Sequence, residues 1–314
     1  MNKKVIAVVG ATGAQGGGLV RAILADKSGE FAARAVTRKP TGDKARALAS
    51  QGVDVVEADL DDTASLIRAF SGAYGAFCVT NFMEHFSGEK ETSQGRSLAQ
   101  AAKNAGIKHA IWSTFEDTRK TFPLGDPRMP TLQGKYKVPH FDAKAEVDQA
   151  FRELGVPTTF LVTSFYWENL IYFGSGPKRG PDGKLAFVLP MGSKKLPGIC
   201  SEDIGKCALG IFKRPELIGK AIGVAGEHLS GAEMAAALGS AIEQPVAFAD
   251  VTPEAYRGFG FPGAAEFGNM FQFKAENESA YRRARDVTFS KMLNPDLQTF
   301  AGWLSRNSSR IPLG

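Results

Sequence analysis

Short apolar runs alternate with amphipathic stretches along the first half of the chain. Unbroken apolar runs predict strands that are buried on both faces, at residues 5–9, 32–37, 53–57, 74–80, 108–114 and 158–163. Apolar positions at helical spacing predict helices between them, at residues 16–26, 41–51, 61–71, 91–106 and 140–154. This alternation is typical of an α/β protein with a doubly wound parallel sheet, that is, a Rossmann fold.

One segment interrupts the alternation. Residues 117–139 carry four prolines, Pro123, Pro127, Pro130 and Pro139, and show no clear period. Loops of this length typically serve as lids or binding loops, or are disordered.

The second half of the chain shows a looser pattern. Helices are expected there at residues 231–243 and 291–304. Since no linker rich in Ser, Pro and Gly separates the halves, we expect the C-terminal part to fold against the first. The predicted division is a Rossmann domain at 1–165, to which part of 195–225 returns, and a smaller α+β C-terminal lobe at 166–314.

Composition narrows the class of protein. Of the 314 residues, 43% are apolar and 23% are charged, which is close to the norm for globular proteins. No stretch approaches the roughly 20 apolar residues of a membrane span, and the N-terminus lacks the apolar core of a signal peptide. Cys78, Cys200 and Cys207 lack CxxC spacing, so we expect reduced thiols, no metal site and a cytoplasmic location.

Glycine and positive charge are both in mild excess. The chain has 35 glycines, and 38 basic against 33 acidic residues give a net charge of +5. Excess glycine indicates tight turns or backbone that approaches a ligand closely. Mild positive charge favours an anionic partner: nucleic acid, a membrane surface or a phosphorylated ligand.

A glycine motif is the strongest local signal for one of these partners. The sequence GATGAQG lies between the first predicted strand and the first predicted helix. Its residues are Gly10, Ala11, Thr12, Gly13, Ala14, Gln15 and Gly16. In this context the glycines let the backbone approach a pyrophosphate, and the helix N-terminus presents free N–H groups to the phosphates. The alternative is a plain glycine-rich turn.

The end of the second predicted strand distinguishes the two nicotinamide cofactors. An NAD site usually has a carboxylate there, whereas this chain has Thr37, Arg38 and Lys39. A guanidinium can bind a 2′-phosphate with two charge-assisted hydrogen bonds, so Arg38 favours NADP(H), with Thr37 and Lys39 as supporting donors. A solvated basic turn is the alternative. Asp59 is placed to accept from the adenine amino group, to cap the helix that begins near Asp61, or to do both.

These motifs together resemble a known family. GATGAQG, TRKP, EADLDD, VTNF, HFDAK, SFYWENL and GFPGAAEFGNMFQF occur in the order found in NmrA-like proteins, which are atypical members of the short-chain dehydrogenase/reductase superfamily. The similarity covers nearly the whole chain and points to the branch of the family that contains an NADPH sensor. HFDAK, YWEN and GFPGA are far more specific than the glycine motif, which marks only the superfamily.

The resemblance implies which residues bind each part of NADP(H). The pyrophosphate would lie on residues 10–16 and the 2′-phosphate on Arg38. The adenine would lie near Asp59 and Leu60. Around the nicotinamide and its ribose the resemblance places Thr80, Asn81, Phe82, Lys144, Tyr166, Trp167, Glu168 and Asn169.

The catalytic pair of the superfamily is incomplete in this chain. Reductases of the superfamily use Tyr-x-x-x-Lys, in which tyrosine donates a proton and lysine lowers its pKa. Lys144 occupies the lysine position, but His140 stands where the tyrosine belongs. Tyr136 should lie in a loop, because Pro139 marks the expected helix start. Ser113 or Thr114, at the end of the fifth predicted strand, occupies roughly the place of the family's catalytic serine.

Two functions are compatible with this site, and both require NADP(H). In the first, proton donation is lost, and cofactor binding orders loops 81–93 and 117–139 to change a surface that a partner protein recognises, by analogy with the sensor branch. In the second, His140 replaces the tyrosine as acid in the reduction of a quinone or a small apolar carbonyl or alkene. Alternatively, His140 only packs at its helix start.

The remaining sequence features give little support for partners other than NADP(H). Arg282, Arg283 and Arg285 are expected on a solvated helix face. Without helix-turn-helix or zinc-finger spacing, we expect no direct contact with nucleic acid, and we expect no membrane contact. The aromatic run 165–167 is expected to form a pocket wall, because ligands bind outside the carboxyl ends of such strands. A homodimer is compatible with the sequence but is not specified by it.

Overall fold

The computed structural model describes residues 3–314, which fold into two compact units. The first unit comprises the chain up to Asp117 together with 139–163 and 204–222. The second comprises 118–138, 164–203 and 223–314. The loop 118–138 thus belongs to the second unit, whereas the sequence pattern had grouped it with the first.

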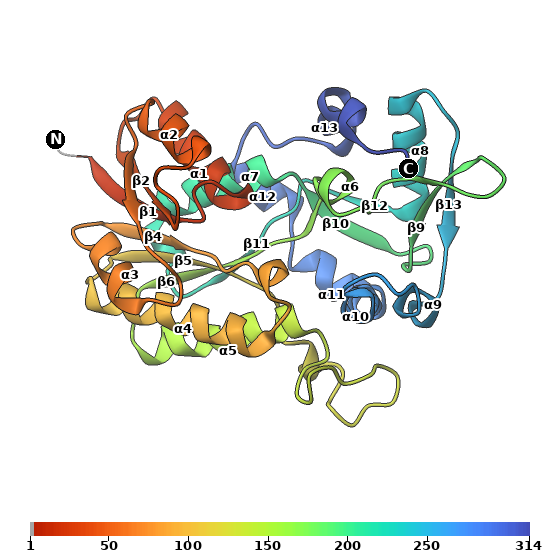
Figure 1. The fold of residues 1–314 in the computed structure, drawn as a ribbon, viewed down its shortest axis with the longest axis horizontal. Helices are drawn as coiled ribbons and strands as arrows, with labels where there is room; N and C mark the ends of the chain where they lie inside the picture. Colours follow the sequence, from red (N-terminus) through yellow and green to blue (C-terminus); the bar gives the residue numbers. More distant parts are fainter. Residues whose placement is uncertain (1–2) are drawn as a thin grey trace. The chain divides into compact units, whose positions relative to one another are not determined.

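A seven-stranded sheet in the order β11-β6-β5-β4-β1-β2-β3 forms the centre of the first unit (Figure 1). The pairs from β3 across to β6 are all parallel, so their carboxyl ends lie along one edge. The strand bounds are β1 (Lys4–Val9), β2 (Phe31–Thr37), β3 (Asp54–Glu57), β4 (Gly75–Cys78), β5 (His109–Thr114), β6 (Thr158–Val162) and β11 (Ala221–Gly223). The strand order changes direction between β1 and β4, which is where a doubly wound sheet binds its ligand.

Helices cover both faces of this sheet, with α3, α4 and α5 on one face and α1 and α7 on the other (Figure 1). The bounds are α1 (Ala14–Ala25), α2 (Asp43–Ala49), α3 (Thr63–Phe70), α4 (Gly88–Asn104), α5 (Pro139–Glu153) and α7 (Ser201–Phe212), of which α7 belongs here from Ile204 on. Phe70 of α3, Leu98 of α4 and Val147 of α5 are fully buried in the core of this unit. Trp112 of β5 stacks on Phe151 at 5.5 Å between ring centroids.

The structure confirms the α/β prediction for this half of the chain. Each of the six expected strands is present with ends within two residues of those predicted, and the five expected helices lie between them. Pro139 begins α5, as its fixed φ and missing N–H favour. The seventh strand, β11, was not predicted as a strand, although part of 195–225 was expected to return to this domain.

Two small sheets and seven helices build the second unit among the described residues. One sheet has the order β12-β10-β7 and the other β13-β9-β8. The strands are β7 (Phe165–Tyr166), β8 (Lys178–Arg179), β9 (Leu185–Leu189), β10 (Lys195–Ile199), β12 (Glu227–Ser230) and β13 (Val246–Asp250). The helices are α6 (Asn169–Tyr172), α8 (Gly231–Ile242), α9 (Pro253–Arg257), α10 (Ala264–Glu276), α11 (Glu278–Arg283), α12 (Val287–Leu293) and α13 (Phe300–Asn307).

The prediction of one helix over 291–304 is wrong. The chain leaves α12 at Leu293 and becomes helical again only at Phe300. Pro295 has no N–H for a helical hydrogen bond. The buried carboxylate of Asp203 also holds the intervening turn, because it accepts from the side chain of Asn294 and the backbone N–H of Gln298, both at 2.9 Å.

The loop 118–138 is fastened to α10 within the second unit. Asn269, which is fully buried, donates to the carbonyl oxygens of Lys137 and Pro130 at 2.6 and 2.9 Å. Gln272 donates to the carbonyl of Arg128 at 3.0 Å. Met129 is also fully buried. The long loop therefore has a defined conformation, although its only helix is the short 3-10 helix Thr118–Lys120.

Two sequence expectations concern cysteines and membrane spans. Cys78, Cys200 and Cys207 are buried free thiols. Within residues 3–314, none of the helices combines the length and apolar character that a membrane span requires.

Candidate functional site

The glycine motif forms the turn between β1 and α1. Gly10 has a φ of +65°, a conformation that side chains of L-residues rarely adopt, and its carbonyl accepts from the N–H of Gly13 at 2.8 Å. A Cβ on Gly16 would lie 2.5 Å from the carbonyl oxygen of Gly10 and 2.7 Å from that of Val9. The start of α1 thus lies directly against the turn, which only glycine permits.

The N-terminus of α1 fits a pyrophosphate. Gly13 is the N-cap residue, no side chain caps the helix, and its first turn contains no acidic residue. The first N–H groups and the positive end of the helix dipole therefore have no anionic side chain on their own helix. Ala11 is buried and Thr12, Ala14 and Gln15 are at least partly accessible. These residues could hold a dinucleotide phosphate, as expected for residues 10–16.

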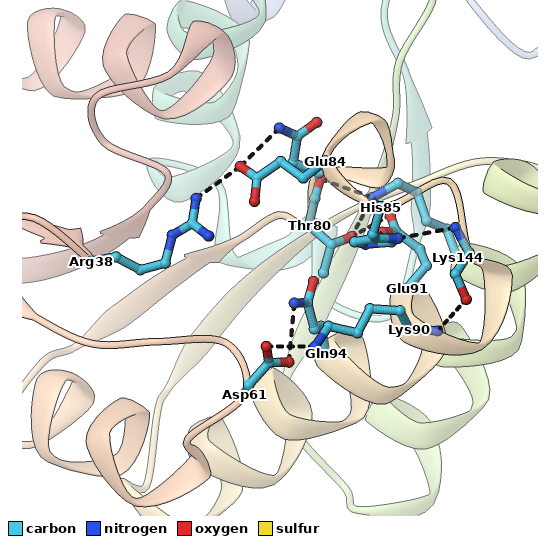
Figure 2. Close-up of polar contacts among 11 residues, drawn as sticks. Arg38, Asp61, Thr80, Glu84, His85, Lys90, Glu91, Gln94 and Lys144 are labelled. Carbon is cyan, nitrogen blue, oxygen red and sulfur yellow. Dashed lines mark hydrogen bonds and ion pairs between the residues drawn. The ribbon is translucent and has the colours of Figure 1, made fainter. Parts of the chain in front are cut away.

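Arg38 follows β2, at the same sheet edge as the glycine loop. Its guanidinium Nη2 lies 2.9 Å from Oε1 of Glu84, and Asn81 Nδ2 donates to the same oxygen at 3.1 Å (Figure 2). Thr37 Oγ1 accepts from the N–H of Lys39 at 3.3 Å. All of these side chains are at least partly exposed, so a ligand can reach them.

Asp59 is not the N-cap of α3, so that alternative is wrong. The helix begins at Thr63, and Asp62 caps it by accepting from the N–H of Ser65 at 3.1 Å. Asp59 Oδ1 instead accepts from the N–H of Asp61 at 2.9 Å. Asp62, not Asp59, is therefore the N-cap of α3. The contact of Asp59 and of its neighbour Leu60 with the adenine stays a prediction.

Lys144, on α5, belongs to a buried polar cluster (Figure 2). Its ammonium lies 2.7 Å from Oε1 of Glu91 and donates to Oγ1 of Thr80 at 2.6 Å. Thr80 in turn donates to the same oxygen of Glu91 at 2.6 Å. The side chain of Glu91 is completely buried and that of Lys144 is 7% exposed. An ion pair that is shielded from solvent, and in which both charged groups also form hydrogen bonds, is rigid.

Electrostatics explains why Glu91 remains ionised there. Burial by itself would raise the pKa of Glu91, but the charge of Lys144, the nearby His85 and hydrogen bonds from Lys144 and Thr80 outweigh it and lower the pKa to about 2. His85 Nε2 lies 3.4 Å from the second carboxylate oxygen, Oε2. Glu91 therefore supplies a full negative charge beside Lys144 at neutral pH.

Sequence reasoning missed Glu84, His85 and Glu91. Residues 81–93 were expected to form a loop, but Phe82–Glu84 is a short 3-10 helix, η1, and α4 begins at Gly88. Ser87 caps α4 by accepting from the N–H of Lys90. A Ser followed by acidic residues before an amphipathic run is a helix-start signal, and it could have moved the predicted start of this helix from residue 91 to Gly88.

The two other catalytic candidates make structural contacts in the first unit. Ser113 Oγ donates to Oε1 of Gln15 at 2.9 Å, which connects the end of β5 to the glycine loop. His140 is buried, and its ring packs on Phe82, Phe115 and Phe141 at centroid distances of 5.6, 5.8 and 4.7 Å. This aromatic packing favours the interpretation of His140 as a residue that stabilises the start of α5.

Tyr136 lies in the loop of the second unit, as Pro139 predicted. It forms an isolated bridge with Leu132. Its ring is fully buried, with the guanidinium of Arg119 5.7 Å from the ring centroid. Tyr136 is thus not on the helix that carries Lys144.

The expected nicotinamide residues Tyr166, Trp167, Glu168 and Asn169 also belong to the second unit. Trp167 is buried against Phe300 and Trp303, at 5.4 and 6.2 Å between ring centroids, so much of the expected aromatic wall is core. Burial raises the pKa of Glu168, whose carboxylate accepts from the N–H of Ser201 at 3.0 Å. Tyr166 remains partly accessible, and the role of this stretch beside a cofactor stays a prediction.

The basic cluster near residue 283 is only partly a solvated helix face. Arg283 is exposed, but Arg285 is completely buried, with its guanidinium 3.5 Å from the ring centroid of Tyr281. Arg282 pairs with Glu278 at 3.0 Å. Nowhere in residues 3–314 do three or more His, Cys, Asp or Glu side chains gather in a group that could hold a metal ion.

Comparison with known proteins places the chain in a family. A sequence model of the NmrA-like family matches residues 2–304. The NmrA-like family domain-containing oxidoreductase FrzB of a Cladobotryum species is 32% identical over 68% of this chain and 65% of its own length, so the chain spans just under two thirds of that relative. An NAD(P)H azoreductase from Xenophilus azovorans is 30% identical over 82% of each chain.

Solved structures show the same fold. NmrA, a negative transcriptional regulator crystallised with NADP, superimposes with a TM-score of 0.73 and 25% identity over 98% of this chain and 95% of its own. Its complex with NAD gives 0.74 and 25% over the same shares. NmrA thus binds a nicotinamide dinucleotide of either kind in its crystals. The chain belongs to the NmrA-like family.

Proposed function

We propose that this protein binds NADP(H) and acts as a redox sensor or regulatory protein. The observation that carries this is the ion pair of Lys144 with Glu91, at 2.7 Å. In a Tyr-x-x-x-Lys reductase the lysine charge lowers the pKa of the tyrosine. Here a carboxylate compensates that charge, and residue 140, four positions before the lysine, is a histidine packed among aromatic rings. We therefore expect Lys144 to bind the ribose of the cofactor and not to activate a proton donor.

The choice of NADP(H) rests on Arg38. A guanidinium can fork onto the 2′-phosphate, and no carboxylate stands at the end of β2 to accept from a ribose hydroxyl. When bound, the dinucleotide would lie on residues 10–16, with Thr80, Asn81 and Lys144 at the nicotinamide ribose. It would supply hydride chemistry, whether or not this protein uses it.

Titration with NADPH, NADP⁺ and NADH, followed by a turnover screen, tests the proposal. We expect micromolar or tighter binding of NADPH, with little turnover on simple carbonyls. Arg38→Asp should weaken NADP(H) far more than NAD(H), because the new carboxylate repels the 2′-phosphate. Fast NADPH oxidation by a quinone or carbonyl that falls in Lys144→Ala would argue against a sensor without activity.

A reductase of a quinone or a small apolar carbonyl or alkene is the second candidate. Its support is the 30% identity to the NAD(P)H azoreductase over 82% of both chains. If His140 is the acid, His140→Phe reduces turnover while NADPH still binds. Unchanged turnover in that variant would remove His140 from the mechanism.

Regulation implies a protein partner that responds to cofactor occupancy. Support comes from the similarity to NmrA, a negative transcriptional regulator. Within the first unit, we expect the segment 82–87 to change conformation when the cofactor binds. Glu84 of this segment contacts Arg38, and His85 contacts Glu91, the partner of Lys144.

A further inference from the structure

Arg38, the residue assigned to the 2′-phosphate, already has an anionic partner in the same unit. Glu84 lies 2.9 Å from it and accepts from Asn81 with the same oxygen (Figure 2). The side chains of Arg38 and Glu84 are 57% and 45% exposed. The pair is therefore accessible to solvent and to a competing anion.

The sheet topology places this pair across the glycine loop. Arg38 follows β2, and Glu84 ends η1 (Phe82–Glu84), which follows β4. In the sheet, β1 lies between β4 and β2, and the glycine loop begins at the carboxyl end of β1. A contact between segments that follow the two flanking strands must bridge the edge at which β1 ends. This edge is where a dinucleotide enters a doubly wound sheet.

We propose that Glu84 is a specificity-determining residue that competes with the 2′-phosphate of NADP(H) for Arg38. The inference rests on the proposed function, in which Arg38 binds that phosphate. A phosphate carries more charge than a carboxylate and can bind the guanidinium through two hydrogen bonds, so it displaces Glu84. NAD(H) has no group that replaces Glu84, and the pair stays closed.

Glu84 consequently lowers the affinity for NADP(H) and leaves that for NAD(H) almost unchanged. Breaking an exposed ion pair of this type changes an equilibrium by roughly two- to fivefold. Glu84 thereby reduces the preference for NADP(H) that Arg38 alone would create. The cofactor selectivity of the protein is the balance of these two side chains.

The test is calorimetric titration of NADPH and NADH into four proteins: wild type, Glu84→Gln, Arg38→Gln and the double variant. Glutamine preserves the size of the side chain and can still accept from Asn81. We expect Glu84→Gln to bind NADPH about two- to fivefold more tightly, with NADH affinity unchanged. The gain should vanish when Arg38 is also replaced. Glu89→Gln, which removes an exposed carboxylate from the first turn of α4, should change neither affinity.

Other outcomes overturn the proposal in distinguishable ways. If Arg38→Gln weakens NADPH selectively but Glu84→Gln has no effect, Glu84 is not a competitor and the proposed function stands. If Arg38→Gln weakens both dinucleotides equally, the phosphate role of Arg38 and this inference both fail. A gain that persists in the double variant, or that Glu89→Gln reproduces, reflects general electrostatics and refutes the proposal. Repeating the titration with 2′,5′-ADP confines the result to the adenosine end, and Glu84→Ala provides a second replacement.

Discussion

The ammonium of Lys144 on α5 and the carboxylate of Glu91 on α4 form a buried ion pair at 2.7 Å. Both groups also bond to Thr80, which follows β4. The pair thus connects two helices on one face of the sheet to the strand edge where the cofactor is expected. Its burial makes each partner dependent on the other, since an unpaired charge in this place would have no solvent.

Replacing Glu91 by Gln should destabilise the protein by about 3 kcal/mol, because it leaves the charge of Lys144 buried without compensation. The free energy of unfolding from urea titrations measures this. Glu89→Gln, on the exposed side of the same helix turn, is the matched control and should change stability by less than about 0.5 kcal/mol. Equal stability of the two variants would show that the pair is not significant for folding.

The same pair predicts a pH dependence. Glu91 has a pKa of about 2 in the folded protein, against 4.5 for an exposed glutamate. A lowered folded pKa gives stability that is present above pH 4.5 and is lost as pH falls towards 2, in total about 3 kcal/mol. Between pH 6 and 3, unfolding free energy should fall more steeply in the wild type than in Glu91→Gln. Parallel curves would contradict the lowered pKa.

Gly16→Ala should reduce the affinity for NADPH and NADH alike. Its Cβ would lie 2.5 Å from the carbonyl of Gly10, so α1 must shift away from the turn and move its N–H groups from the phosphate. We expect a loss of about tenfold or more, which corresponds to 1.4 kcal/mol. Gly125→Ala, where a Cβ meets open space, is the control and should leave binding unchanged. A selective loss of NADPH alone would point to Arg38 instead.

Asn269→Leu should release the loop 118–138 from α10. The substitution leaves the carbonyls of Pro130 and Lys137 without their donor, at about 1–3 kcal/mol for each buried group. Limited trypsin digestion should then cleave at Arg119, Lys120, Arg128 and Lys135 faster than in the wild type. Asn307→Leu removes an amide that bonds to Trp303 on α13 and should not affect this loop. An unchanged cleavage rate would show that other contacts hold the loop.

The Rossmann core was predictable from local pattern. Runs such as residues 5–9 are apolar without interruption because both faces of their strands are buried, and Gly10–Gly16 marks the turn that follows. The two-part helical region after Val287 was not predictable in this way, since its break depends on Pro295 together with the distant Asp203. The seventh strand likewise depends on an edge of β6 that is distant in sequence.

The residues of the candidate site were likewise predictable only in part. The glycine loop, the basic residue after β2 and the lysine of α5 were recognisable without a structure, because each belongs to a short motif at a strand or helix end. The carboxylates that pair with Arg38 and Lys144 became evident only from the folded chain. Glu84 and Glu91 lie 46 and 53 residues from Arg38 and Lys144, and no local period relates them. Parallel strands bring the segments that follow β2 and β4 to one edge, which pairs Arg38 with Glu84, whereas the packing of α4 on α5 pairs Glu91 with Lys144.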